Sequence, residues 1–489
     1  MSRSEELPGT NEGHRRPSRG VWILAAAMFA SACAAIPDTP VDAGMAIPEG
    51  WAESEPAVAA PNLTQYWIEL DDPLLTQFVE QAAAQNLDLA QSAARVKQAR
   101  AQLRGARAGY FPQLTGSAGV ARNETLRGSS SPTDGTSFDI GADASWEIDL
   151  FGRIAGDVAA SRADLEAAGY SLADLQRVIV AQVAQSTIQA RATAMQLAIA
   201  RDTLRYQDEN LQIAQWRVQA GLVSSLDVEQ ARGQRAQTAA TIPLLESNLT
   251  ATANAISTLI GEPPGRVLAL LRDSDFVPDA PALDAYDTPA GVLRLRPDVR
   301  AAEATLVANS ARVGVARAQL LPLVRLTGSL TAGRGNLADL FDLITGNLFA
   351  GVSQLIFDGG RTRAQIDSAE AAAEGSLAAW RLAILGALED VETAAVDLRT
   401  ARERVAIYGE AVDAANNAAI LARSQYQAGL TDFRDLLTSE NQLLSARNSL
   451  VSAQADRASA FVRLIQALGG GWSPATLPYP LPSADGNDQ

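Results

Sequence analysis

Residues 137–150 read SFDIGADASWEIDL, and this stretch decides the class of fold. Apolar residues occupy every second position from Phe138 to Leu150, while acidic, small polar or glycine residues fill the positions between them. Unbroken alternation over this length is typical of a β-strand that crosses a membrane. The alternative is a two-sided strand in a soluble sheet, but an acidic soluble strand of this length is unusual.

Three further segments alternate in the same way: residues 324–332 clearly, and residues 113–122 and 347–357 less cleanly. Four strands cannot close a membrane barrel, and open sheet edges are not tolerated in lipid. We therefore expect the chain to share a barrel with copies of itself, giving eight strands from two copies or twelve from three. Acidic residues on one strand face suit a water-filled lumen, which favours the larger barrel and three copies.

A very long helix is predicted directly after this strand, from Arg153 to Val218. Its apolar or small residues recur every seven positions, which is typical of a supercoiled helix about 100 Å long. The same spacing recurs later in the chain. The two sets are Val183, Ala190, Leu197, Leu204, Leu211 and Val218, and then Val391, Leu398, Val405, Val412, Ala419 and Tyr426. Taken alone, the first set fits a dimerising coiled coil equally well.

The chain repeats itself at an offset of 208–210 residues. Ala220-Gly221-Leu222 matches Ala428-Gly429-Leu430, and comparable matches precede both long helices. We interpret this as a tandem duplication, with repeats at 62–261 and 291–469, a linker at 262–290 and a tail at 470–489. Each repeat is expected to contain a helix of about thirty residues, two strands, a long helix and a return helix. The first helix should end before Pro112 or Pro322, and the return helix at about Gly261 or Gly469.

The N-terminus has the pattern of a secretory signal, with a basic segment, a short apolar run and small residues before a cysteine. The small residues before Cys33 resemble the lipobox of bacterial lipoproteins. This resemblance implies a signal peptide at 1–32, a lipid on Cys33 and a tether at 33–61. Ala34, rather than aspartate, suggests sorting to the outer membrane. The alternative is an incidental cysteine in a signal peptide.

Composition excludes several classes of protein. The net charge of −16, without a basic patch, argues against nucleic acid as a partner. His14 is the only histidine and Cys33 the only cysteine, so the rest of the chain has no thiolate or imidazole for a metal or a nucleophilic pair. We predict no cofactor and no metal site. A carboxylate-based enzyme is the only catalytic alternative, and no concentrated pair of acids supports it.

Several motifs resemble, in order, signature stretches of the outer-membrane efflux protein (TolC) family. They are residues 145–153 (SWEIDLFGR), 296–300 (RPDVR) and 357–361 (FDGGR). With the lipobox, they are most similar to the lipoprotein branch that includes OprM and NodT-type proteins. The resemblance implies a mainly α fold with membrane β-structure: a homotrimer with a twelve-stranded β-barrel in the outer membrane and an α-helical barrel crossing the periplasm. It also implies a periplasmic adaptor and an inner-membrane pump, usually of the resistance-nodulation-division type, as partners, and no catalysis.

The family's gate residues map onto the two helical hairpin tips. Asp435 matches the constriction aspartate, whereas the second ring aspartate is replaced by Thr438. Asp432 lies three residues before Asp435 on the same helix face and could contribute to an acidic ring. An N-cap role for Asp432, which satisfies free backbone N–H groups, is slightly favoured.

The resemblance also implies a gate-holding link between Tyr426 and Asp227, although Tyr426 continues the seven-residue pattern and could simply pack there. The family's companion arginine falls at Thr431, so that second link is missing. The turns at Gly221-Leu222 and Gly429-Leu430 match the tips that meet the adaptor, and they also fit glycine C-caps.

We therefore predict a passive outer-membrane exit duct for small amphipathic compounds in tripartite export. The first alternative is the same duct serving protein or peptide secretion. The second is a non-transporting periplasmic coiled-coil lipoprotein, which the alternating strands disfavour.

Overall fold

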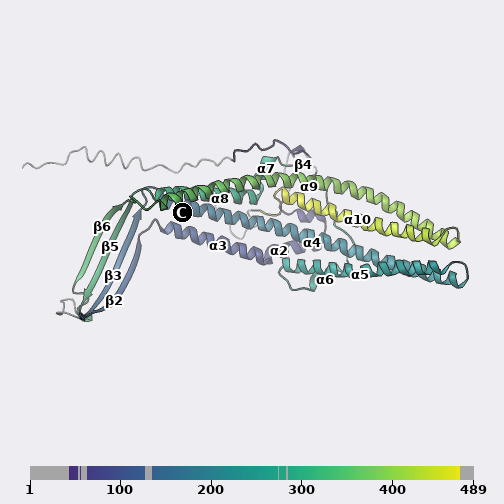
Figure 1. Ribbon diagram of the computed structural model, residues 1–489, viewed down its shortest axis with the longest axis horizontal. Helices are drawn as coiled ribbons and strands as arrows, with labels where there is room; N and C mark the ends of the chain where they lie inside the picture. The colour runs from purple at the N-terminus through teal and green to yellow at the C-terminus, as the bar shows by residue number, and fades with distance from the viewer. Residues whose placement is uncertain are drawn as a thin grey trace, which may run out of the picture. The chain divides into compact units, whose positions relative to one another are not determined.

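A computed structural model describes residues 43–52, 55–56, 63–126, 135–273, 275–281, 283 and 285–473 (Figure 1). Cys33, the predicted signal peptide and part of the predicted tether lie outside the described residues. The described chain forms two compact units. The sheet unit comprises Arg107–Val158 and Ala311–Ala369, and the helical unit comprises Ala43–Ala106, Ala159–Ser310 and the described part of Glu370–Gln489.

Two long helical hairpins dominate the fold. Helix α4 (Arg153–Gln219) is followed by α5 (Ser225–Leu259), and α9 (Arg361–Ala428) is followed by α10 (Phe433–Ala467). Helices α5 and α10 each have 35 residues and begin 208 residues apart (433 − 225), as do α4 and α9 (361 − 153). Figure 1 shows both turns at the same end of the helical unit. The predicted duplicated hairpins are confirmed.

The seven-residue seams are buried within the single chain over part of their length. Val183, Leu197, Val391 and Leu398 are all at most 2% exposed. Helix α9 also contains one stretch that is apolar enough to cross a membrane by length and composition, which for a single helix is weak evidence. Because α9 runs unbroken through this stretch to Ala428 and then turns into α10, we assign it to the hairpin rather than to a membrane span.

The helix of about thirty residues predicted at the start of each repeat is wrong. The first repeat has α2 (Pro73–Gln85) and α3 (Leu87–Ala108), and the second has α7 (Pro289–Leu295) and α8 (Pro297–Ala318). Asn86 is extended and its Oδ1 accepts hydrogen bonds from Asp88 N and Leu89 N, which ends one helix and caps the next. Pro297 causes the second break because Arg296, the residue before it, is kept extended.

The four predicted strands form one antiparallel sheet in the order β2-β3-β5-β6. Their bounds are β2 Gln113–Asn123, β3 Gly135–Ile148, β5 Leu323–Arg334 and β6 Ile344–Ser353. A short 3-10 helix, η2 (Leu337–Asp339), lies between the last two strands. Strand β6 begins and ends earlier than the predicted 347–357, because pairing with β5 selects the residues that enter the sheet.

The register places most apolar residues of all four strands on one face, whereas Leu323 and Phe349 lie on the other. Ala144 pairs with Leu114 and Gly328, and Gly328 pairs with Leu348 on the far strand. On the other face Asp143 lies opposite Thr115 and Ser329. A one-residue slip in any strand would invert its faces, so this agreement fixes the register.

The main core lies in the helical unit, where the short elements pack against the long helices. Tyr66 of η1 (Tyr66–Leu70), Phe78 of α2 and Phe461 of α10 are fully buried there. The Asp72 side chain caps α2 by accepting hydrogen bonds from Leu74 N and Leu75 N. It also forms a buried, bidentate ion pair with Arg191, with N–O distances of 2.7 and 2.9 Å. This pair fixes the start of the first repeat to the middle of α4.

The inter-repeat linker meets the residues that precede the first repeat. Strand β1 (Glu55–Pro56) pairs in parallel with β4 (Ala285–Tyr286), after the short α6 (Arg266–Leu271). Trp51 Nε1 donates to Asp287 O at 2.7 Å, and Arg381 Nε of α9 donates to Ala43 O at 2.8 Å. Part of the predicted tether is therefore bound along α9 and the linker.

Candidate functional site

The two hairpin tips have the same backbone turn. Gly221 and Gly429 have φ values of 69° and 77°, in the left-handed region that favours glycine. Leu222 N donates to Arg217 O and Leu430 N to Gln425 O, each at 2.9 Å, which completes a Schellman motif at both helix ends. The C-cap interpretation of these glycines is confirmed. A role in contacting an adaptor stays a prediction.

Each turn presents one leucine to the surroundings. Leu222 is 69% exposed and Leu430 79% exposed. Because a C-cap needs only the glycine, exposed leucines directly after it are available for a partner.

The residues that begin the return helices differ between the tips. Ser224 caps α5 by accepting a hydrogen bond from Leu226 N at 3.1 Å. Asp432 occupies the equivalent N-cap position of α10 with an extended backbone, but its side chain makes no capping hydrogen bond. Asp432 is therefore the N-cap residue of α10, as predicted. The predicted capping by its side chain is wrong, because the carboxylate is exposed and accepts no capping hydrogen bond.

Asp435 lies on the exposed side of α10, within its first turn. Thr431 Oγ1 donates to its Oδ2 at 2.8 Å, so Thr431 orients this carboxylate. Thr438 Oγ1 instead donates to Arg434 O within the helix. The residue at the position of the missing arginine thus still contacts the candidate gate acid.

Tyr426 is 2% exposed and packs in a cluster with Ala231, Ala422, Phe433 and Leu436, its ring 5.2 Å from that of Phe433. Among the described residues its hydroxyl has no hydrogen-bond partner, so the expected link from this hydroxyl to Asp227 is not formed. Burial raises the pKa of Tyr426, which keeps the phenol neutral. In this structure Tyr426 packs as a residue of the seven-residue seam, which was the alternative interpretation.

Arg217 joins the two tips, a role that no sequence motif had predicted. Its Nη1 donates to Tyr426 O at 2.7 Å, and its guanidinium lies 4.5 Å from the centre of the Tyr426 ring. Tyr426 O also accepts from Gly429 N, so Arg217 binds the C-cap of the other hairpin. The only sequence feature that could have indicated this residue is its position in the last turn of α4, where a positive charge interacts favourably with the helix dipole.

The acids near Arg217 influence one another. Burial raises the pKa of Asp227, the negative charge of Asp432 raises it further, and the positive charge of Arg217 opposes both. Asp227 and Asp432 therefore lie close enough to repel, one from each hairpin, with a guanidinium between the tips.

A buried polar cluster also connects the hairpins behind the tips. Asn210 Nδ2 donates to both carboxylate oxygens of Glu440, at 2.9 and 2.7 Å, and Arg423 Nη2 donates to Glu440 Oε1 at 2.9 Å. Glu440 is 8% exposed. This charge is buried and paired, so α4, α9 and α10 are held in one arrangement here. Among the described residues, no group of three His, Cys, Asp or Glu side chains could hold a metal.

The family model for the outer membrane efflux protein matches residues 78–262 and 289–470, two segments that together cover most of the chain. The chain belongs to the outer membrane efflux protein family.

Individual relatives agree with this assignment. The efflux protein is 32% identical over 468 residues to the pyoverdine export outer membrane protein OpmQ of Pseudomonas aeruginosa, covering 93% of this chain and 97% of that protein. It is 30% identical to nodulation protein T of Rhizobium leguminosarum bv. trifolii, covering 84% and 89%. Among solved structures, the outer-membrane channel OprN is 32% identical with a TM-score of 0.78, covering 90% and 98%.

The predicted fold, family and general function are confirmed by these similarities. This protein is an efflux channel of the outer membrane, and its family consists of channel and transport proteins rather than enzymes.

Proposed function

We propose that three copies of this chain form a closed duct through the outer membrane. The alignment of apolar residues on one face of all four strands is the observation that carries this proposal. Strands β2 and β6 are the two edges of the described sheet. Open edges are costly in lipid, so β2 of one copy pairs with β6 of the next, and three times four strands gives twelve.

The duct passively conducts small amphipathic compounds. An inner-membrane pump, of the resistance-nodulation-division type, supplies the energy, and a periplasmic adaptor binds the tips at Gly221-Leu222 and Gly429-Leu430. The exposed leucines of both turns support this contact. The name of the related pyoverdine exporter supports small solutes over secreted proteins.

The tips form the gate in its closed state. Asp435 and Asp432 of three copies form an acidic constriction around the axis, which attracts cations and repels anions. Tyr426 and Asp227 contribute to the closed arrangement indirectly: the Tyr426 carbonyl receives Arg217, whose charge faces Asp227. Opening requires the Arg217 bond to break, because it joins one hairpin to the other.

A lipid on Cys33 anchors the mature N-terminus in the outer membrane. Residues 43–52 then follow α9, where Arg381 and Glu392 bind their backbone. Metabolic labelling with palmitate tests the anchor: label on the native chain and none on Cys33→Ser is expected. Equal labelling of the two chains contradicts the assignment.

Purification followed by reconstitution in planar bilayers tests the duct as a whole. We expect an SDS-resistant trimer that conducts ions. A soluble, non-conducting protein would exclude the proposal. Deleting the gene and profiling sensitivity to drugs, dyes, solvents and metals would then identify the exported class.

A further inference from the structure

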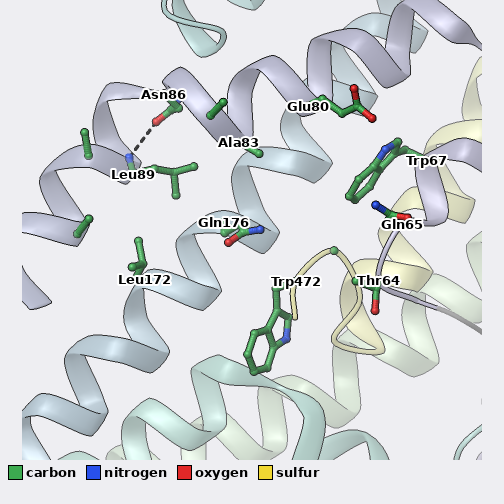
Figure 2. A pocket seen from close by; sticks show the side chains of 14 residues that line it. Thr64, Gln65, Trp67, Glu80, Ala83, Asn86, Leu89, Leu172, Gln176 and Trp472 are labelled. Atoms are coloured by element: carbon green, nitrogen blue, oxygen red, sulfur yellow. Dashed lines mark hydrogen bonds between the residues drawn. The ribbon is translucent and has the colours of Figure 1, made fainter. Parts of the chain in front are cut away.

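One face of the four-stranded sheet is strongly apolar and exposed. Leu114 and Leu348 on this face are 74% and 78% exposed. In the helical unit, by contrast, Figure 2 shows Trp67 and Leu172 beside a cavity between helices, and these side chains are 8% and 3% exposed. A continuous, exposed apolar face needs an apolar environment. The proposed duct, on which this inference rests, places the face against the lipid of the outer membrane.

Charged residues are divided between the two faces of the sheet. The acidic residues of the strands, Asp139, Asp143 and Glu147, all lie on the face opposite the apolar one. Within the four described strands, the apolar face carries two charged residues, Arg122 and Arg334. A charge on the lipid face of a membrane strand is destabilising at the midplane and tolerated near the interface. The depth of the two arginines therefore decides what they can bind.

Both arginines lie at the same end of the apolar face. Arg334 is opposite Phe138 and Arg122 is opposite Thr136, near the beginning of β3. At this end loops join β2 to β3 and β5 to β6, whereas the long helices follow the other end of β3 and β6. The two Cα atoms are two strands and two residues apart, which corresponds to about 12 Å. In the proposed duct this loop end faces the exterior.

The position of Arg334 coincides with the expected outer edge of the hydrocarbon layer. From Val324 to Arg334, strand β5 advances ten residues (334 − 324), or about 34 Å along the strand. A strand tilt of about 40° reduces this to about 26 Å across the membrane, close to the apolar band of about 25 Å that is typical of membrane barrels. The guanidinium thus reaches the headgroups, while the apolar stem of its side chain stays beside Phe138.

Two guanidinium groups at headgroup depth have the chemistry of a phosphate site. A guanidinium donates paired hydrogen bonds to phosphate oxygens, and basic side chains near a membrane surface attract anionic headgroups. Glu124 lies 3.9 Å from Arg122, but the two side chains are 69% and 74% exposed, and such exposed pairs contribute little. The outer leaflet of an outer membrane is built from phosphorylated glycolipid, so phosphate is available at this depth.

We propose that Arg122 and Arg334 together bind the phosphate groups of a glycolipid in the outer leaflet of the outer membrane. The guanidinium groups contact the headgroup, and the acyl chains pack along the apolar face, where Val120 and Leu330 are 64% and 59% exposed. The site lies on the outer surface of the barrel and is separate from the lumen. It fixes the loop end of the barrel at the level of the headgroups.

Lipid A binding to the purified trimer, counted by native mass spectrometry, tests the site. Diphosphorylated lipid A is the probe, and the test variant carries Arg122→Gln together with Arg334→Gln. Arg325→Gln is the matched control, because Arg325 belongs to the same strand as Arg334 but lies opposite Glu147 on the other face. We expect about tenfold weaker binding in the double variant and native binding in the control. Dephosphorylated lipid A should bind the native trimer as weakly as the intact lipid binds the double variant.

Equal binding of lipid A by the native protein and the double variant would overturn the proposal. Displacement of lipid A by inorganic phosphate would also overturn it, because the site would then take free phosphate. A variant with Arg122→Lys and Arg334→Lys keeps both charges and should retain most of the binding, which separates loss of the site from misfolding. SDS resistance and conductance of the same samples test the duct independently. A conducting trimer that binds no lipid A excludes only the lipid site, whereas a native chain that forms no trimer excludes the duct and this site together.

Discussion

The two hairpin tips have the same backbone but carry different polar side chains. Both long helices end in a Schellman motif with an exposed leucine, and both return helices begin at residues 208 positions apart. The first tip carries Arg217, where the second has Gln425 at the equivalent position (217 + 208). The second tip carries Asp432, where the first has Ser224. The duplicated chain thus kept the glycines that make the turn and diverged in charge.

Because of this divergence, the side-chain contact between the tips runs from the first hairpin to the second. Arg217 of the first tip binds the C-cap carbonyl of the second, whereas the equivalent position of the second tip holds the neutral Gln425. The same divergence occurs at the junctions of the repeats. Asn86 Nδ2 binds Leu259 O at the end of α5, and Arg296 Nη1 binds Ala467 O, the equivalent carbonyl of α10. A neutral amide in the first repeat is therefore replaced by a guanidinium in the second.

The junctions give the largest expected effect. Arg296 is 3% exposed and donates to the backbone carbonyls of the buried Ala387 and Ala467, and it also pairs with the partly exposed Asp298 and Asp390. Arg296→Ala leaves the two carbonyls without this donor, and we expect it to reduce the free energy of unfolding by about 3–4 kcal/mol, less than for a fully buried ion pair because water can reach both carboxylates. Asn86→Ala, which removes a neutral bond and a cap, should cost about 1–2 kcal/mol. Urea unfolding followed by circular dichroism measures both, and equal losses would show that the two junctions are energetically alike.

The buried cluster behind the tips comes next. Glu440→Ala leaves Asn210 and Arg423 without their acceptor, which should cost about 2–3 kcal/mol, because Arg423 is partly exposed and can regain water. Glu440→Gln keeps the shape and one acceptor and serves as the control. Thermal unfolding of the trimer should rank native above Gln above Ala. A Glu440→Ala protein as stable as the native one would exclude a structural role for this cluster.

Arg217→Gln tests the directional bond by giving the first tip the residue of the second. Replacing the guanidinium that donates to Tyr426 O with a shorter, neutral amide should raise the resting conductance several-fold with little change in stability, because one partly exposed hydrogen bond contributes about 1 kcal/mol. Gln425→Lys is the control, since it adds charge at the equivalent position without removing that bond. Unchanged conductance in Arg217→Gln would remove Arg217 from the gate.

The smallest effect concerns pH. The pKa of Asp227 is raised by burial and by Asp432, so the neutral form is favoured in the closed tip. The neutral carboxyl of Asp227 therefore stabilises the closed tip fully at pH values below the ordinary carboxyl pKa. This stabilisation is lost as the pH rises through the raised pKa of Asp227. Resting conductance should therefore increase as the pH rises above the ordinary carboxyl pKa of about 4. Asp227→Asn should flatten this increase, and Asp432→Asn should shift it to lower pH; a native profile in Asp227→Asn contradicts the assignment.

The fold could largely be predicted because its signals are local and repeated. Arg153 and Arg361 follow strand patterns, and glycines end the long helices, so both starts and both turns were placed correctly. The break at Asn86 was missed because Asn is tolerated in helices and its capping bonds depend on the fold. The bounds of β6 were misplaced because alternation continues past the last residue that pairs with β5.

The site was less predictable. Glycine conformations could be predicted from the turn alone, but the partner of Arg217 is a backbone carbonyl 209 residues away, which no spacing reveals. The expected Tyr426 link failed for a related reason. The hydroxyl is buried by Phe433 and its neighbours, and only the assembled tips decide which polar groups meet.

We expect the dissimilar tips of three copies to close the duct at Asp435. Single-channel conductance in planar bilayers, recorded for the native trimer and for Asp435→Ala, tests this closure. A low resting conductance is expected for the native protein and a clearly higher one for the variant. Equal conductance in the two would place the constriction at other residues.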